Sequence, residues 1–149
     1  MTEIFFYKLK NLSIELFLIS LIEKSISKNW NSLVLLDNIE RMEEINDLMW
    51  TFNDTSFIPH GSQSDLNPDK HKVYLTCNEE NLNNSNIIFS IDGIIINQPD
   101  NWKRCIYIFN EQNLKVTDEL ESYKRGIEDL NYDLKSFEQD NNGKWISNN

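Results

Sequence analysis

The sequence contains no alanine, and it has only four glycines, three prolines and two cysteines among its 149 residues. Alanine codons are rich in G and C, so their absence indicates drift in an AT-rich genome. The same drift favours asparagine, and pairs such as Asn83-Asn84 therefore carry little weight as motifs. Hydrophobic residues make up 40% of the chain and aromatic residues 11%, which excludes an intrinsically disordered protein.

The scarcity of glycine excludes the common phosphate-binding loops. Those loops need glycine because a phosphate must approach backbone N–H groups that side chains would shield. The first predicted turn, residues 8–11, contains no glycine, and the four glycines at positions 61, 93, 126 and 143 form neither a P-loop nor a dinucleotide fingerprint. We therefore expect no nucleotide cofactor.

Histidine and cysteine are too few and too widely spaced for a metal site. Ten residues separate His60 from His71, and neither Cys77 nor Cys105 has a partner at ligand spacing. Both cysteines lie in or beside apolar runs, which is typical of buried reduced thiols in the cytoplasm. Cys105 falls within a predicted strand, where a thiol is usually inert, so it is a poor candidate for a nucleophile.

Long hydrophobic runs are also missing. The most apolar stretch, Leu12 to Ile22, contains Glu15 and is much shorter than the roughly 20 residues that cross a bilayer. The amino terminus has Glu3 where a signal peptide would be basic, and no small-residue cleavage site follows. We therefore expect a soluble, cytoplasmic protein without a membrane partner.

Basic residues are outnumbered. The 14 lysines and arginines face 24 aspartates and glutamates, for a net charge of −10. Duplex binding through phosphate neutralisation requires the opposite balance, and an anionic membrane would repel such a chain. We expect no direct contact with nucleic acid. Acidic pairs such as Glu43-Glu44 and Glu79-Glu80 are interpreted as solvated surface and not as catalytic carboxylates.

Strand-like and helix-like segments alternate along the chain, which is typical of a parallel α/β sheet. The pattern predicts a parallel α/β sheet within one domain over residues 1–149. Asp37 is the expected cap of the second helix. The expected strands are Ile4–Tyr7, Leu33–Leu36, Val73–Thr76, Ile87–Ile91 and Cys105–Phe109, and the expected helices are Leu12–Lys28, Asn38–Met49 and Gln112–Leu130.

Two stretches are less regular. Asp92-Gly93 between apolar runs could form a hairpin with Ile94–Ile96, but a parallel strand that ends at Asp92 fits the α/β pattern better. The connection from Thr51 to Lys72 holds two prolines and little periodicity, and long connections of this kind are often functional.

Aromatic residues gather in this connection. Trp50 and Phe52 precede Phe57, Ile58 and Pro59 in a region that should face solvent. Part of the cluster can fold back onto the core, and the rest can form an exposed apolar patch. Exposed patches usually mark protein interfaces.

The same segment resembles a known family. Leu48–Phe52 (Leu-Met-Trp-Thr-Phe) and Ser56–Gly61 (Ser-Phe-Ile-Pro-His-Gly) are similar to the signature of the chi subunit of bacterial DNA polymerase III, in its alphaproteobacterial form. The resemblance continues in order along the chain, through Leu75-Thr76, Glu79–Asn83, Ile88–Gly93 and Asp140–Trp145.

The resemblance implies a three-layer, Rossmann-like α/β domain with a mostly parallel central sheet. It also implies that the domain has no catalysis or cofactor of its own and bridges two parts of the replication machinery. One surface, around Trp50, Phe57, Ile58 and Pro59, would contact the psi subunit of the clamp loader or a substitute. Another would bind the acidic, hydrophobic C-terminal tail of single-stranded DNA-binding protein. Some family members also pair with a helicase-like repair protein.

The implied tail-binding residues lie on the last predicted helix and are Lys115, Tyr123 and Lys124. Leu120 stands where the family has a further basic residue, and from Lys115 to Arg125 basic and acidic residues are equal in number. Tail binding through Lys103, Arg104 and Arg125 is therefore an alternative. Tyr123 also lies on the apolar stripe of that helix, so packing is an alternative role for it. The competing functional hypothesis, a small α/β enzyme acting on a phosphorylated metabolite, rests on the βαβ opening alone.

Overall fold

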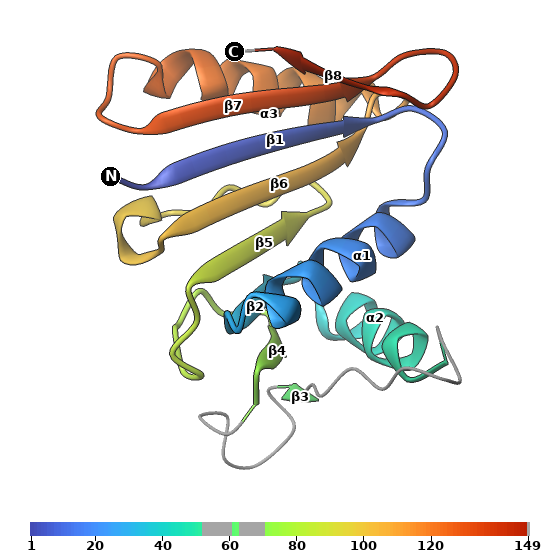
Figure 1. The fold of residues 1–149 in the computed structure, drawn as a ribbon, viewed down its shortest axis with the longest axis vertical. Coiled ribbons are helices and arrows are strands. Elements are labelled where there is room, and N and C mark those ends of the chain that lie inside the picture. Colours follow the sequence, from blue (N-terminus) through green and yellow to red (C-terminus); the bar gives the residue numbers. More distant parts are fainter. Residues whose placement is uncertain (52–60, 63–70, 149) are drawn as a thin grey trace.

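The computed structural model describes residues 1–51, 61–62 and 71–148. Its central feature is one eight-stranded sheet flanked by helices (Figure 1). The strands are β1 (Glu3–Leu9), β2 (Ser32–Leu35), β3 (Gly61–Ser62), β4 (Val73–Thr76), β5 (Ile87–Ile91), β6 (Arg104–Asn110), β7 (Asp133–Gln139) and β8 (Trp145–Asn148). The helices are α1 (Ile14–Ser27), α2 (Ile39–Thr51) and α3 (Leu114–Ile127), with a 3-10 turn at Pro99–Asn101.

The strand order is β3-β4-β2-β5-β6-β1-β7-β8, and every neighbouring pair is parallel except the antiparallel pair β7–β8. The connection from β1 to β2 crosses one face of the sheet with α1, and α2 follows on the same face. The connection from β6 to β7 passes over the other face with α3, behind the sheet in Figure 1. The predicted three-layer, mostly parallel α/β fold is confirmed.

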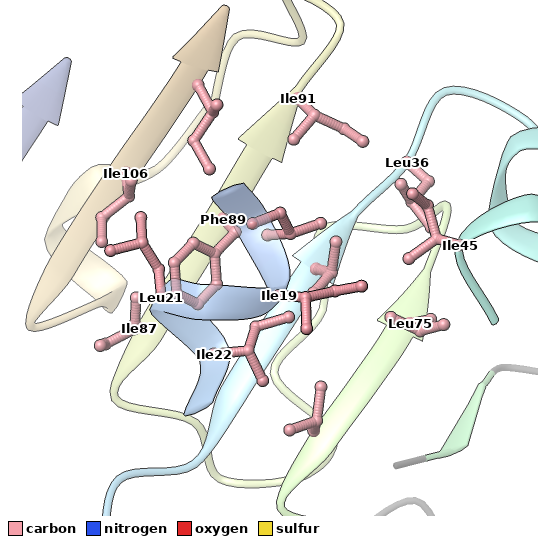
Figure 2. Close-up of a cluster of buried hydrophobic side chains, with 14 of the residues drawn as sticks. Ile19, Leu21, Ile22, Leu36, Ile45, Leu75, Ile87, Phe89, Ile91 and Ile106 are labelled. Atoms are coloured by element: carbon pink, nitrogen blue, oxygen red, sulfur yellow. The ribbon is translucent and has the colours of Figure 1, made fainter. Parts of the chain in front are cut away.

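Side chains alternate along each strand between the two faces, as the two-residue period of a strand requires. Strand positions such as Val34, Phe89 and Ile106 belong to the core cluster under α1 and α2. Figure 2 shows Phe89 of β5 beside Leu21 and Ile22 of α1. Burial of each such side chain contributes about 1.5–3 kcal/mol. The alternate side chains of the same strands lie on the opposite face of the sheet, which α3 covers. Together with two α3 residues they form a second buried cluster that includes Ile4, Phe6, Leu33, Leu35, Ile88, Tyr107, Phe109, Leu120 and Ile127.

The long predicted helix near the amino terminus forms, but it is shorter than expected. Ser13 is its N-cap, since its hydroxyl accepts a hydrogen bond from the N–H of Leu16 at 3.3 Å. Leu12 therefore precedes the helix. Leu16 remains exposed, whereas Leu18, Ile19, Leu21 and Ile22 are buried.

Asp37 does not cap α2, contrary to the prediction. The side-chain oxygen of Asn38 accepts a hydrogen bond from the N–H of Arg41 at 2.8 Å, so Asn38 is the N-cap. The prediction placed the cap one residue too early because aspartate and asparagine both suit this position and stand side by side. Glu40 then falls one position short of a capping box.

The preferred interpretation of Asp92-Gly93 is confirmed. β5 pairs in parallel with both β2 and β6, so Ile94–Ile96 is no hairpin strand. Asp92 and Gly93 both take positive φ angles, 63° and 85°, and turn the chain onto the α3 face. Ile96 is buried there beside α3 residues.

The carboxyl-terminal third differs most from expectation. α3 ends at Ile127, so the prediction that this helix continues to Leu130 is wrong. Leu130 lies beyond the helix and is exposed. The sequence pattern does not predict β7 and β8, because the tail is polar apart from Leu134, Phe137, Trp145 and Ile146. In the structure they form the edge of the sheet beyond β1.

The two cysteines form no disulfide. Cys105 is buried within β6, and burial, with Glu79 and Asp100 adding to it, raises the pKa of its thiol to about 12. Cys77 is half-buried after β4. Within the described ranges, no helix has the length and apolar character needed to cross a bilayer.

Candidate functional site

The helix expected to bind an acidic tail, α3, is well defined. Asn113 caps it by accepting a hydrogen bond from the N–H of Val116 at 3.2 Å. Its apolar stripe, Val116, Leu120, Tyr123 and Ile127, recurs at helical spacing and packs on the sheet. Leu120, at a position where the resemblance implies a basic residue, is buried in this core.

Tyr123 is partly a packing residue. Its ring lies 5.6 Å from the Tyr107 ring and 6.4 Å from the Phe6 ring, centre to centre. The Tyr107 hydroxyl accepts a hydrogen bond from the N–H of Ile96 at 3.0 Å. Burial and a hydrogen bond with Tyr123 raise the pKa of Tyr107. The remaining half-exposed part of Tyr123 lines a shallow hollow beside Ile95 and Leu130.

Lys124 lies on the other flank of α3, over a separate hollow of about 220 Å³, which we call the α3 hollow. Its ammonium group donates a hydrogen bond to the Ser136 hydroxyl and lies 5.9 Å from the centre of the Phe6 ring. The residues that line the hollow are Phe6, Lys8, Phe109, Leu120, Glu121, Lys124, Ser136, Phe137 and Glu138. An apolar floor beneath a cation suits an apolar side chain that carries or adjoins a carboxylate.

Lys8 contributes a second cation to the α3 hollow, but two carboxylates hold it. Its nitrogen lies 3.3 Å from an oxygen of Glu121 and 3.7 Å from one of Glu138. Lys124 forms no such ion pair within the described part of the chain. An acidic ligand in this hollow would therefore meet Lys124 as its main cationic contact.

Lys115 does not join the other two residues. It is exposed in the first turn of α3, nine positions before Lys124. At 3.6 residues per turn, the two lysines project about 180° apart and are separated by about 13 Å along the axis. The structure thus places Lys124 and Tyr123 on adjacent flanks of the helix and Lys115 away from the α3 hollow.

The other predicted interface begins at Trp50, in the last turn of α2, where its side chain is 53% exposed. Phe57, Ile58 and Pro59 lie outside the described residues, so only the tryptophan of this set is placed. Its exposure agrees with the expected role at an interface and does not by itself define a patch.

Sequence reasoning missed Lys8, Phe6 and Ser136 as members of the α3 hollow. Phe6 and Lys8 lie on β1, and Ser136 lies on β7. The two strands pair in parallel, and Phe6 stands opposite Ser136 in their register. The only signal for β7 in the sequence is a pair of apolar residues, Leu134 and Phe137, in a polar tail. No local pattern connects these strands to Lys124.

The position where doubly wound folds bind ligands is filled by the chain itself. That position lies between the carboxyl ends of β1 and β6, whose connections leave to opposite faces. The N–H groups of Lys10 and Asn11 both donate to the Gln139 side-chain oxygen, at 2.8 and 3.4 Å, and Lys10 pairs with Glu111 at 3.6 Å. Two of the backbone donors at this position, those of Lys10 and Asn11, are thus already bonded. Among the described residues, His, Cys, Asp and Glu form no group of three that could hold a metal.

Comparison with known proteins identifies relatives. The family model described as DNA polymerase III chi subunit, HolC, matches residues 1–134. A probable DNA polymerase III subunit chi from Rickettsia prowazekii (strain Madrid E) is 33% identical over 128 residues, which is 84% of this chain and 77% of the relative. The family match includes β1 and α3 and ends within β7.

Proposed function

Because the chain belongs to the chi subunit family of DNA polymerase III, we propose that it is a non-catalytic, cytoplasmic subunit that bridges the clamp-loader assembly to single-stranded DNA-binding protein during DNA replication. The family match over residues 1–134 is the observation that carries this proposal. The bonded N–H groups of Lys10 and Asn11 support a role without a nucleotide at the usual ligand position.

The proposed site for the tail of single-stranded DNA-binding protein is the α3 hollow. Its floor of Phe6, Phe109 and Leu120 suits the apolar part of the tail, and Lys124 can bond a carboxylate. Tyr123 borders this site from the neighbouring flank, and Lys115 would meet only a more distant part of the tail. Because Glu121 and Glu138 already hold Lys8, we expect modest affinity that falls steeply with salt.

The second proposed contact is an interface at Trp50, Phe57, Ile58 and Pro59 for a psi subunit or a protein that replaces it. A helicase-like repair protein is a further candidate for the same surface. The exposed indole of Trp50 supports this, because tryptophan is enriched among the residues that dominate interface energies.

Tail binding is tested by fluorescence anisotropy with a labelled C-terminal tail peptide of single-stranded DNA-binding protein. Replacing Lys124 with alanine should weaken binding about tenfold, since it removes one charge-assisted hydrogen bond worth about 1.4 kcal/mol at a partly exposed site. Lys144→Ala, an exposed lysine outside the hollow, is the matched control and should change nothing. Absence of salt-sensitive binding by the unchanged protein up to high micromolar concentration would refute the tail-binding half of the proposal.

The Trp50 interface is tested by affinity capture from native cell extract. The double variant Trp50→Ala/Phe57→Ala should lose the clamp-loader partner that the unchanged protein captures, while circular dichroism shows an intact fold. An unchanged set of captured proteins would show that this surface is not the interface.

A further inference from the structure

A second hollow lies on the opposite face of the sheet, at the edge where the parallel strands begin. It measures about 130 Å³, and we call it the α1 hollow. Its floor is apolar or aromatic, with Tyr7, Leu21, Ile87 and Ile106 from β1, α1, β5 and β6. Its rim carries Lys24, Lys28 and Arg104 beside Trp30.

Further cations extend this rim across the amino ends of the strands. Lys103 lies 5.6 Å from the centre of the Trp30 ring, and Lys135 lies 5.6 Å from the centre of the Phe5 ring. Arg104 contacts both rings, at 5.0 and 4.7 Å. In a chain with a net charge of −10, this edge therefore concentrates positive charge on one surface.

Within the part of the chain that the structure describes, the lysines of this edge are not neutralised by ion pairs. Lys24, Lys28, Lys103 and Lys135 form no ion pair with a carboxylate of the described residues. Arg104 does, since Glu3 accepts from its guanidinium at 2.9 Å. Asp133 stands beside Glu3 in the register of β1 and β7, so two carboxylates border the four lysines.

We propose that the α1 hollow binds an acidic peptide, with one apolar side chain on its floor and flanking carboxylates on Lys24, Lys28 and Lys103. Charge complementarity selects the sign of the ligand. The ring geometry favours a peptide over single-stranded nucleic acid, because bases need open aromatic faces on which to stack. Here cations already lie over the faces of Trp30 and Phe5.

This site is separate from the α3 hollow proposed for the tail. The floor of the α1 hollow belongs to the core under α1, whereas the α3 hollow belongs to the core under α3. Each can therefore be disabled without the other, and the proposal does not depend on the identity of the tail-bearing partner.

The experiment uses the full chain and a short fluorescein-labelled peptide of alternating aspartate and leucine. In a Lys124→Ala background, which weakens binding at the α3 hollow about tenfold, the peptide should still bind. Adding Lys24→Gln and Lys28→Gln should weaken that remaining binding about tenfold, and Lys144→Gln, the same chemical change at a remote exposed lysine, should not. The indole NMR signal of Trp30, assigned with a Trp30→Phe variant, should shift on binding.

Four results would overturn the proposal. The first is loss of all peptide binding in the Lys124→Ala background, and the second is residual binding that the two glutamine substitutions leave unchanged. The third is tighter binding of oligo(dT) than of the peptide, which would assign the surface to nucleic acid. A peptide with asparagine in place of aspartate should not bind, and equal binding of that peptide would likewise contradict a role for the lysines.

Discussion

At the scale of single residues, Arg41 makes the most consequential polar contacts. Its side chain, 18% exposed, donates to carboxylates of Glu15 and Asp92 at 2.8 Å and of Glu44 at 3.0 Å. It thereby ties the first turns of α1 and α2 to the end of β5. Burial raises the pKa of Glu15, but hydrogen bonds from its own backbone N–H, Arg41 and Ser13 outweigh this, so the net pKa lies below its ordinary value.

Replacing Arg41 with methionine should lower the free energy of unfolding by about 2 kcal/mol at pH 7, because hydrogen bonds to charged groups contribute about 1.5–3 kcal/mol. A carboxyl group with a lowered folded-state pKa stabilises above its unfolded pKa of about 4.3 and loses that contribution as the pH falls through the folded value. Urea titrations from pH 7 to 3 should therefore show a smaller acid loss for the variant than for the unchanged protein.

The control is Glu44→Gln, at the most exposed partner of Arg41, 66% exposed. Its effect should stay within about 0.5 kcal/mol, since surface ion pairs contribute little. An equal cost for the two variants, or parallel pH curves, would show that the network does not act through Glu15 and Asp92.

At the scale of elements, the turn after β5 depends on glycine for two reasons. Gly93 has a φ of +85°, and a Cβ there would lie 3.0 Å from a methyl group of Val116 on α3. Gly126, by contrast, is helical and faces open space. The same substitution at these two positions should therefore have opposite effects.

Gly93→Ala should lower the free energy of unfolding by about 1–2 kcal/mol, through left-handed strain and contact with Val116. Gly126→Ala should raise it by roughly 0.5–1 kcal/mol, because alanine favours a helix over glycine. Thermal unfolding followed by circular dichroism measures both. A neutral Gly93→Ala would mean that the turn adjusts without moving α3.

The edge strand β8 pairs with β7 alone among the described strands. Trp145 lies 5.5 Å from Tyr7 and 5.1 Å from Phe17, ring centre to ring centre, so it joins β8 to β1 and α1. The next residue, Ile146, is 44% exposed on the other side of the strand.

Trp145→Ala should cost about 2 kcal/mol, roughly half the loss for a fully buried tryptophan, because this side chain is half-buried. Ile146→Ala, the matched neighbour, should change stability by less than about 0.5 kcal/mol. Urea unfolding monitored by far-ultraviolet circular dichroism gives both values. If the two losses were equal, β8 would not be anchored by the aromatic contact.

At the scale of the whole molecule, the two apolar cores share one sheet. Every central strand contributes alternate side chains to each face, as β1 does with Phe5 on one side and Phe6 on the other. Loss of either core therefore exposes the other, and we propose that residues 1–149 form one cooperative domain.

This proposal predicts coincident urea transitions by tryptophan fluorescence and far-ultraviolet circular dichroism, which is the signature of two-state unfolding. Trp30 and Trp102 lie on the two faces of the sheet, so fluorescence reports on both cores. Separate transitions would indicate that one layer unfolds independently and would contradict a single domain.

Much of this architecture could be predicted because buried parallel strands have a local signature. Leu33–Leu36 and Ile87–Ile91 are continuous apolar runs, since both of their faces are covered, and the stripe of α3 from Val116 to Ile127 repeats at helical spacing. β7 and β8 have no such signature, because most of their described residues are half-exposed or exposed and their composition is that of a polar tail.

The candidate sites divide in the same way. The sequence by itself determined the fold class, the absence of glycine loops and the family, because each can be inferred from local apolar runs, motif spacing and composition. Only the tertiary structure decided that Lys124 and Tyr123, neighbours in the chain, lie on different flanks of α3, and that Lys8 and Ser136 line the same hollow as Lys124. It also decided that lysines of an acidic chain gather around Trp30. These groupings depend on strand order, since parallel pairing brings distant residues to one edge, and no local pattern encodes that order.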